Sequence, residues 1–267
     1  MTIHFQRGDS IQAAVDRADP GDTVLVHAGT YREDGQPCPT EPSQTCAVLI
    51  RDDRIRLVGK RSRRRRVVLK AKGGRHKGIA VVDGTDPSCV NDRSKRLHRA
   101  LIKGFTVKGF EDDGVFLFCV DRYRVTRVRA VGNDEYGIFP SHSVAGRVDH
   151  SLASGANHTG IYIGPSRRGR VDHNKARKNV SGFEIENSSR VRADHNVATG
   201  NTAGILSFAL SGLDVKSNHD NRIDHNRVRR NNKQNTCVDP DDTVCKVPRG
   251  TGILVLAVDR NIVRRTA

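Results

Sequence analysis

The phrase Gly114-Val-Phe-Leu returns as Gly137-Ile-Phe-Pro, Gly160-Ile-Tyr-Ile, Gly182-Phe-Glu-Ile and Gly204-Ile-Leu-Ser, once every 22 or 23 residues. A second phrase follows each copy of the first: Arg124-Val-Thr, Arg147-Val-Asp-His, Arg170-Val-Asp-His and Arg192-Ala-Asp-His, then Arg222-Ile-Asp-His after eight extra residues. A fixed period of this length is typical of a chain built from stacked structural repeats. The repeat is therefore the first guide to the architecture.

Within each unit, apolar residues alternate with other residues, which is the period of a β-strand. A unit this short cannot bury its own apolar face, so successive units must stack, about 4.8 Å apart. Asparagine ends most units, at Asn133, Asn179, Asn201 and Asn231. It suits stacking because it tolerates left-handed turns and its amide can pair with its neighbour above. We therefore predict an all-β fold, a single-stranded parallel β-helix with rungs of 22 or 23 residues.

The start of the chain reads Ser10-Ile-Gln-Ala-Ala-Val-Asp, then Pro20-Gly-Asp-Thr-Val-Leu-Val and Gly29-Thr-Tyr-Arg. With the repeats, this start resembles the right-handed parallel β-helix repeat proteins of the pectin-lyase-like superfamily. That superfamily includes NosD-like and carbohydrate-binding/sugar-hydrolase (CASH) domains. The resemblance covers nearly the whole chain and implies a right-handed coil. The same scaffold carries lyases, epimerases, hydrolases, esterases and binding proteins, so the resemblance is specific for fold and not for activity.

We predict one domain over residues 1–267, opened by a short amphipathic helix at 10–19 that caps the first rung, with Ser10 as its N-cap. Four stretches interrupt the pattern and are expected to be inserted loops: 34–46, 83–97, 209–221 and 232–249. Such loops usually gather on one face of a solenoid and often build its binding site. The final strand, Gly252-Ile-Leu-Val-Leu-Ala-Val, is apolar at successive positions, so we expect its outward face to be covered.

Six cysteines suggest an oxidising compartment. Cys38 and Cys46, and likewise Cys237 and Cys245, are separated by seven residues in polar loops, and neither pair has zinc-site spacing. We expect a disulfide in each loop. Cys89 and Cys119 allow either a third disulfide or a buried thiol at Cys119. The chain starts without signal-peptide features, so we expect a secreted or periplasmic protein whose signal has been removed.

The formal net charge of +16 indicates a polyanionic partner or a heavily solvated surface. The densest charge run begins at Lys60-Arg-Ser-Arg. Nucleic acid is a poor partner because few aromatic residues are present to stack on bases. No apolar run approaches the length that spans a bilayer. We expect an acidic polysaccharide as the partner, with no nucleic acid, no membrane and an open oligomeric state.

The candidate site residues follow from the pleat of a β-strand, in which successive side chains point to opposite faces. We number each unit from its repeat glycine as position zero and expect the odd positions to face the core. The outward columns at +2 and +4 hold Phe116, Phe139, Tyr162, Glu184, Leu206 and Leu254, then Phe118, Ser141, Gly164, Glu186, Phe208 and Leu256. Position −2 adds Asp112, Glu135 and His158, with Tyr136 and His142 nearby. Aromatic faces edged by carboxylates and a histidine are a composition suited to sugar binding. We take Phe116, Phe139, His142 and Phe208 as candidate substrate-binding residues.

Lyases and C5-epimerases of polyuronates need a base, an acid and a positive group that stabilises an enolate. The resemblance implies that His, Tyr and Lys or Arg fill these roles in related β-helix enzymes. Here His158 or Tyr136 is the candidate base, Tyr162 the acid, and Arg167 or Arg168 the substrate-binding cation. The chain lacks the Asp-Pro-His motif of alginate epimerases and the motifs of pectinesterases and polygalacturonases.

Glu184 and Glu186 lie two apart on one strand, so their carboxyl groups are expected about 5–7 Å apart, a range that spans both classes of glycosidase. Glu135 completes the set of candidate catalytic residues. An exposed acidic pair or a cation site is the alternative, so no cofactor is required and calcium is a candidate. The Arg-x-Asp-His column repeats in every unit, whereas a metal site is local, and we interpret it as scaffold.

The first functional hypothesis is thus a lyase or C5-epimerase that acts on a uronate-containing polysaccharide. A non-catalytic, NosD-like carbohydrate-binding module is the second, and a glycoside hydrolase that uses Glu184 and Glu186 is the third.

Overall fold

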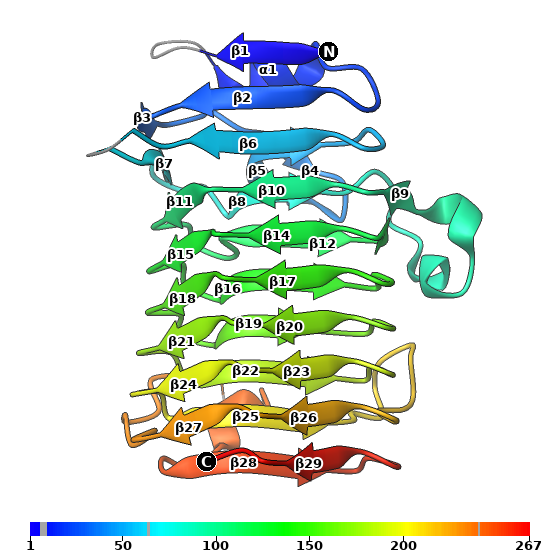
Figure 1. The fold of residues 1–267 in the computed structure, drawn as a ribbon, viewed down its shortest axis with the longest axis vertical. Coiled ribbons are helices and arrows are strands. Elements are labelled where there is room, and N and C mark those ends of the chain that lie inside the picture. Colours follow the sequence, from blue (N-terminus) through cyan, green and yellow to red (C-terminus); the bar gives the residue numbers. More distant parts are fainter. Residues whose placement is uncertain (6–9, 63–64, 240) are drawn as a thin grey trace.

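The computed structural model describes residues 1–5, 10–62, 65–239 and 241–267, and Figure 1 shows the rungs stacked along one long axis. Three parallel sheets of ten, eight and nine strands, here sheets A, B and C, run along that axis within these ranges. The predicted all-β parallel β-helix is confirmed. Figure 1 also shows the two termini at opposite ends of the stack.

Each regular rung contributes one strand to each sheet, and the unequal numbers come from the ends of the stack and from one antiparallel hairpin in sheet C. Sheet A consists of β1 (Thr2–Phe5), β2 (Thr23–His27), β6 (Arg56–Lys60), β10 (Leu101–Lys103), β14 (Arg124–Thr126), β17 (Arg147–Asp149), β20 (Arg170–Asp172), β23 (Arg192–Asp194), β26 (Arg222–Asp224) and β29 (Ile262–Arg264). Sheet B consists of β3 (Gly29–Tyr31), β7 (Val67–Lys70), β11 (Phe105–Lys108), β15 (Arg129–Val131), β18 (Leu152–Ser154), β21 (Lys175–Arg177), β24 (Val197–Thr199) and β27 (Arg227–Arg229).

Sheet C consists of β4 (Gln36–Cys38), β5 (Glu41–Ile50), β8 (Lys77–Val81), β12 (Val115–Phe118), β16 (Tyr136–Ser141), β19 (Thr159–Ile163), β22 (Ser181–Glu186), β25 (Ala203–Phe208) and β28 (Thr251–Leu256). Strands β9 (Leu97–His98) and β13 (Val120–Asp121) form a separate pair. Repeat positions pair in register, as in Arg147↔Arg170 and Ile161↔Phe183. Every unit therefore places the same position above its equivalent.

A short helix, α1 (Ile11–Asp16), covers the first rung with Ile11, Ala14 and Val15 buried. Ser10 caps it by accepting a hydrogen bond from the Ala13 N–H, as predicted. The helix is shorter than the expected 10–19, because the chain turns at Pro20 to enter β2.

The repeat glycines point into the core, which interrupts the strict alternation assumed from the sequence. A Cβ on Gly137 would lie 2.4 Å from the Gly160 carbonyl oxygen and 2.9 Å from the Ala153 Cβ, so no side chain fits. Positions zero and +1 thus both face inward, and position −1 can face outward. Tyr136, at −1, is the residue whose predicted orientation changes.

Buried polar ladders run the length of the stack. Asn179, Asn201 and Asn231 pair side chain to side chain at 3.1 and 3.0 Å, which confirms the predicted ladder, although Ala156 separates Asn133 from it. A second ladder, not predicted, joins Asn174, Asn196 and Asn226 at 3.1 and 3.0 Å. These side chains also bond to main-chain groups, so the turns leave few unpaired polar groups.

The Arg-x-Asp-His column forms a third ladder. Its aspartates are fully buried under half-buried arginines, and Arg147 pairs with Asp149 at 3.3 Å and with Asp172 at 2.6 Å. His150, His173, His195 and His225 stack at 5.0–5.1 Å between ring centroids. Each charge therefore meets an opposite charge on its own rung and on the next.

The inserted loops are stapled by three disulfides, Cys38–Cys46, Cys89–Cys119 and Cys237–Cys245, so all six cysteines are paired. The two predicted bridges are confirmed, and the open pair forms a bridge. Residues 34–46 form an antiparallel hairpin of β4 and the start of β5, not an irregular loop. The insertion at 83–97 carries two short 3₁₀ helices, η1 (Pro87–Val90) and η2 (Arg93–Lys95).

The last rung is more open than expected. Leu256 is 55% exposed and Val255 is 39% exposed, whereas Leu254 packs beside the 232–249 loop. The expectation that the outward face of this strand is covered is thus wrong at Leu256, because the loop reaches back over β25 instead. None of the helices in the described ranges has the length and hydropathy of a membrane span.

Asn201→Ala should lower the free energy of unfolding by about 3 kcal/mol, because it leaves buried partners on two neighbouring rungs unpaired. Urea titration of the purified chain measures the change. Asn91→Ala, at an exposed asparagine, is the control and should change stability by less than about 0.5 kcal/mol. Equal effects of the two substitutions would contradict a stabilising ladder.

Candidate functional site

The outward side of sheet C carries a cluster of aromatic rings. Phe139 stacks on Tyr162 with centroids 4.4 Å apart, and Tyr136 contacts Phe139, His158 and Tyr162 at 4.7–5.0 Å. Phe116 and Phe118 extend the cluster toward the N-terminal rungs. The structure therefore brings together Phe116, Tyr136, Phe139, His158 and Tyr162, which the sequence singled out as candidates.

A hydrogen-bonded chain links His158 to Glu184. Asp242 Oδ2 lies 2.6 Å from His158 Nε2, and His158 Nδ1 lies 3.0 Å from Thr159 Oγ1. The Thr159 hydroxyl in turn donates to Glu184 Oε2. Four side chains from two rungs and one inserted loop thus form one continuous polar relay.

Burial and charge shift the pKa values in this relay. Burial, with repulsion from Glu186, raises the pKa of Glu184 to about 7, although His158 opposes the shift. Burial alone would lower the pKa of His158, but its bond to Asp242 and the nearby Glu184 outweigh burial and raise it. The relay therefore places a histidine that is protonated more readily than usual beside a carboxyl group that can give or take a proton near neutral pH.

Glu186 and Tyr162 form a second polar pair. The Tyr162 hydroxyl donates to Glu186 Oε2, and both groups are buried. Burial, followed by the Glu186 charge, raises the pKa of Tyr162 well above its usual 10.0. Burial raises the pKa of Glu186 as well, while the bond from Tyr162 opposes that shift. Tyr162 is consequently a proton donor and not a phenolate.

The predicted outward columns do face away from the core. They are nevertheless shielded from solvent, because the loop at 232–249 covers them. Glu184 is 2% exposed, Glu186 6% and Phe208 2%. Val244 and Val247, around η3 (Val244–Lys246), pack in one apolar cluster with Leu206 and Phe208. Phe208 is therefore a contact for this loop and is not free for sugar.

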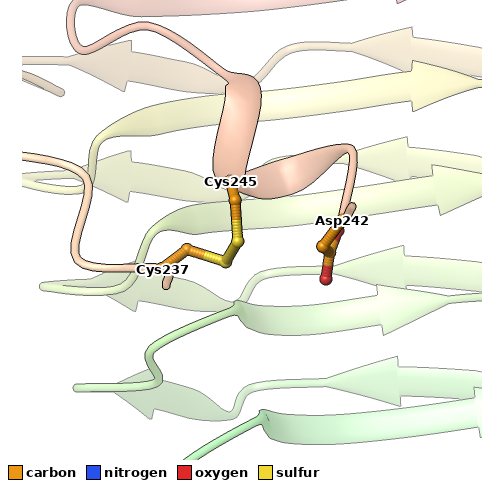
Figure 2. Close-up of side chains that lie close together, drawn as sticks. All are labelled: Cys237, Asp242 and Cys245. Carbon is orange, nitrogen blue, oxygen red and sulfur yellow. A yellow bond between two sulfur atoms is a disulfide. The ribbon is translucent and has the colours of Figure 1, made fainter. Parts of the chain in front are cut away.

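Figure 2 shows the Cys237–Cys245 disulfide and Asp242 on this loop in front of the strands. The donor atoms of the three residues lie within 4.8 Å of one another, as in a metal site. The two sulfur atoms are bonded to each other, however, so they are not available as thiolate ligands. The group is a loop staple beside a carboxylate that binds His158.

A second acidic group lies under the N-terminal side of the cluster. Asp112, Asp113 and Glu135 have carboxyl oxygens within 4.8 Å of one another. The Lys77 ammonium group pairs with both aspartates, 2.9 Å from Asp113 Oδ2, and lies 4.9 Å from the Phe116 ring centroid. Lysine thus already supplies the cation that this acidic group requires. Calcium would have to displace it.

A cavity of about 340 Å³ opens beside His158. Its lining is acidic, and the carboxyl groups come from both the rungs and the loop: Glu111, Asp134, Glu135, Asp239 and Asp242. Burial and the neighbouring Asp112 raise the pKa of Glu135 to about 9, so the other four supply the negative charge near neutral pH. Two residues of the relay, His158 and Asp242, line this cavity. A local negative field surrounds it, although the whole chain carries a net charge of +16.

Two predicted residues lie elsewhere, and a third, His142, lies at the edge of the aromatic cluster with its ring centroid 4.9 Å from that of Phe118. Arg167 donates to the Val90 carbonyl oxygen, and it and Arg168 belong to the turn that follows β19, past the end of the strand opposite from His158. His142 binds Asp214 of the 209–221 loop at 3.0 Å. The structure does not bring an arginine to Glu184 or Tyr162 among the contacts of the described residues, so the predicted cation must come from another group.

Sequence analysis missed Asp242, Thr159 and Lys77. Asp242 lies 84 positions from His158 in an irregular insertion, where no period marks it. Thr159 occupies the position before the repeat glycine Gly160, which strict alternation assigns to the core. Lys77 precedes Gly78 on an early rung, as Tyr136 precedes Gly137. The repeat therefore indicates that Lys77 and Tyr136 occupy equivalent positions.

The fold and this site define the class of protein: a parallel β-helix with a loop-covered polar site on one sheet. The model of the right handed beta helix region matches residues 88–265. The chain therefore belongs to the right-handed β-helix family. No curated protein matches the sequence significantly.

Among solved structures, the chain is similar to the A-module of a mannuronan C-5 epimerase from Azotobacter vinelandii. The TM-score is 0.73 and the identity 18%, over 96% of this chain and 65% of that one. A pectate lyase matches at a TM-score of 0.52 and 13% identity, over 100% of this chain and 78% of that one. A tailspike protein of an Escherichia coli bacteriophage, in complex with a pentasaccharide, matches at 0.61 and 12%, over 95% and 46%. At these identities the likeness shows the fold alone.

The His158–Asp242 pair should hold the loop most firmly between about pH 3.8 and 6.5, the ordinary values of the two groups. The raised pKa of His158 gives stability that is lost as pH rises through that pKa, and the lowered pKa of Asp242 gives stability that is lost under acid. The raised pKa of Glu184 acts in the same direction as that of His158. Amide exchange in residues 236–247, corrected for intrinsic rates, should therefore speed up from pH 6 to 8.

Asp242→Asn should reduce amide protection in the loop at pH 6 by about tenfold, since it removes a charged hydrogen bond. Asp241→Asn, which removes the same charge from an exposed neighbour, should leave it unchanged. Equal protection in the two variants would show that the ion pair does not hold the loop.

Proposed function

We propose that the chain is a carbohydrate-active β-helix protein that acts on a uronate-containing polysaccharide by proton abstraction, as a lyase or a C5-epimerase. One observation carries the proposal. A buried carboxyl group with a pKa of about 7, Glu184, lies between the His158–Asp242 pair and Tyr162. Groups with such pKa values are suited to proton transfer at neutral pH. The fold shared with an epimerase and a pectate lyase agrees with this chemistry.

We propose roles that differ from those expected from the sequence. Burial raises the pKa of Tyr136 well above 10.0, so it is unsuited to act as a base. The hydrogen bond to Asp242 favours the protonated form of His158, so His158 is suited to be the positive group. Glu184 then acts as the base and Tyr162 as the acid, with Glu186 able to return a proton to Tyr162 through their hydrogen bond.

In the proposed step, Glu184 takes the proton from the carbon next to the uronate carboxylate. The electron pair moves onto that carboxylate as an enolate, which the His158 imidazolium stabilises. In a lyase the enolate collapses, the bond to the glycosidic oxygen breaks, and that oxygen takes the Tyr162 proton. In an epimerase Tyr162 returns a proton to the opposite face of the carbon. The steps use side chains of this chain alone.

Substrate reaches Glu184 only if the 232–249 loop moves away, because the carboxyl group is shielded in the closed form. The acidic cavity beside His158 is the opening through which a sugar would enter. We propose that the protein is secreted or periplasmic, because its three disulfides are suited to an oxidising compartment.

Glycoside hydrolysis is the second candidate, and the local charge favours it. Glu184 and Glu186 project from one strand, two positions apart, and the surrounding carboxylates repel a polyuronate more than a neutral sugar. In this case Glu184 is the acid and Glu186 the second carboxylate. The two reactions differ in their products, because only a lyase creates an unsaturated uronide.

Glu184→Gln should lower kcat by at least about 1,000-fold with little change in KM, because the amide can still accept the Thr159 bond but cannot carry a proton. Unsaturated-uronide absorbance, new reducing ends and solvent proton exchange are followed together on polyuronates and on neutral glycans. Asp83→Asn, at an exposed aspartate, is the control. New reducing ends that appear without unsaturated-uronide absorbance would identify the protein as a hydrolase instead. Binding without any turnover would make this a non-catalytic module and contradict the proposal.

A further inference from the structure

The outer side of sheet B carries cations on five of its eight strands, β7, β11, β15, β21 and β27. Its eight strands contain seven basic residues and no acidic residue: Lys70, Lys108, Arg129, Lys175, Arg177, Arg227 and Arg229. All of these side chains are exposed except Arg129, which is half-buried. The other two sheets differ, because sheet A neutralises its arginines with buried aspartates and sheet C carries Glu184 and Glu186.

A groove borders this sheet at the turn between sheets A and B. Its first part, about 460 Å³, is lined by Lys60, Arg61, Arg66, Lys103 and Arg127. A second part, about 570 Å³, shares Arg61, Arg66 and Arg127 with the first and continues along the stacked histidines to His195. No acidic residue lines either part within the described chain. Because equivalent positions of successive rungs line it, the groove runs parallel to the helix axis.

The groove cations lack counter-charges. Among the described residues, no carboxylate lies within ion-pair distance of Arg61, Arg66, Arg127 or Lys175, although pairs are formed along all of the neighbouring sheet A ladder. Burial and the charges of Arg66 and Arg177 lower the pKa of Arg129, which shows that these guanidinium groups crowd one another. The guanidinium groups repel one another at this separation, and an external anion bound between them would offset that repulsion.

We propose that this basic face, the seven sheet B cations together with Lys60, Arg61, Arg66, Lys103 and Arg127, binds a linear anionic polysaccharide that runs along the helix axis. Carboxylate or sulfate groups along the sugar chain would meet cations that recur on every second rung from β15 to β27. The surface is separate from the loop-covered relay on sheet C, and the proposal does not rest on the proposed catalysis. Binding here holds whether or not the chain turns over its ligand.

A polysaccharide fits this face better than a nucleic acid does. Base stacking needs exposed aromatic rings, and the two aromatic residues in the sheet B strands, Tyr31 and Phe105, are both buried. The half-exposed imidazole edges of His150, His173 and His195 offer further polar contacts to an anionic sugar. Their Nδ1 atoms are engaged by aspartates on the same rung, which fixes the rings in the stack.

The test compares two triple variants of the full chain that each remove three positive charges. The first carries Arg129→Gln, Lys175→Gln and Arg177→Gln on the basic face. The second carries Arg54→Gln, Arg99→Gln and Arg122→Gln, three exposed arginines at equivalent positions of a different turn. Calorimetric titration at low ionic strength uses heparin as the sulfated probe, polygalacturonate as the carboxylate probe, neutral dextran and duplex DNA.

The wild-type chain should bind at least one anionic polysaccharide and not dextran, with an affinity that falls as salt rises. The basic-face triple should bind at least about tenfold more weakly, and the other triple should stay within about threefold of wild type. Equal losses in both triples, or tighter binding of DNA than of either polysaccharide, would overturn the proposal. Heparin and polygalacturonate separate sulfate from carboxylate recognition.

A footprint on the unsubstituted chain keeps the test independent of how well the variants fold. Lysine acetylation should be slowed by the bound probe at Lys70, Lys108 and Lys175, and unchanged at Lys95 and Lys216, which lie on inserted loops. Protection at the loop lysines alone would place the ligand elsewhere and overturn the proposal. Because neither measurement depends on turnover, an absence of catalytic activity would leave this result unaffected.

Discussion

In-register stacking of like upon like is the constraint on which the whole structure depends. Each repeat position lies directly over its own equivalent at the spacing of paired β-strands, so every residue type must tolerate a copy of itself above and below. Asparagine meets this condition because its side-chain N–H donates to the following rung and its side-chain oxygen accepts from the preceding rung, as at Asn201. Histidine meets it by ring stacking, as at His173. Glycine meets it by having no side chain where Gly137 approaches the next backbone.

Charged residues are the hardest to stack in this way, and sheet A shows how they are accommodated. A column of aspartates alone would repel itself, and so would a column of arginines. Interleaving them lets Arg147 pair with the aspartates of two rungs, so that each buried carboxylate is bound from both sides. The desolvation cost of burying Asp172 is offset only because those partners are fixed in place by the register.

The same constraint explains what the sequence could predict. A fixed period determines which residues stack, so the repeats predict the strands of the rungs, the asparagine ladder and the scaffold role of the Arg-x-Asp-His column. Ser10 marks the start of α1 because a cap is a local feature. The cysteine pairs within one loop are predictable from their closeness in sequence. The Cys89–Cys119 disulfide was not predictable in this way, because the approach of the two cysteines depends on how an insertion folds back on the rungs.

The candidate site was predictable only in part, for physical reasons. The outward columns correctly collected Tyr162, Glu184 and Glu186 on one face, since pleat and period determine orientation there. Their burial was not predictable, because it depends on the 232–249 loop, which has no period. The partner of His158, the residue Asp242, comes from that loop, and the raised pKa values follow from the burial that the loop creates. Periodic sequence thus determines where side chains point, and aperiodic sequence determines what surrounds them.

The distribution of charge is the strongest argument against inferring a binding site from the net charge. A value of +16 suggests a uniformly attractive surface for polyanions, yet the cavity beside His158 is lined by carboxylates. Stacking favours this segregation, because equivalent positions gather on one face, as the cations of alternate rungs do along sheet B. A ligand responds to the local field, which is screened within about 10 Å at moderate salt, and not to the total charge. On this molecule, the basic face and the buried polar relay lie on different sheets.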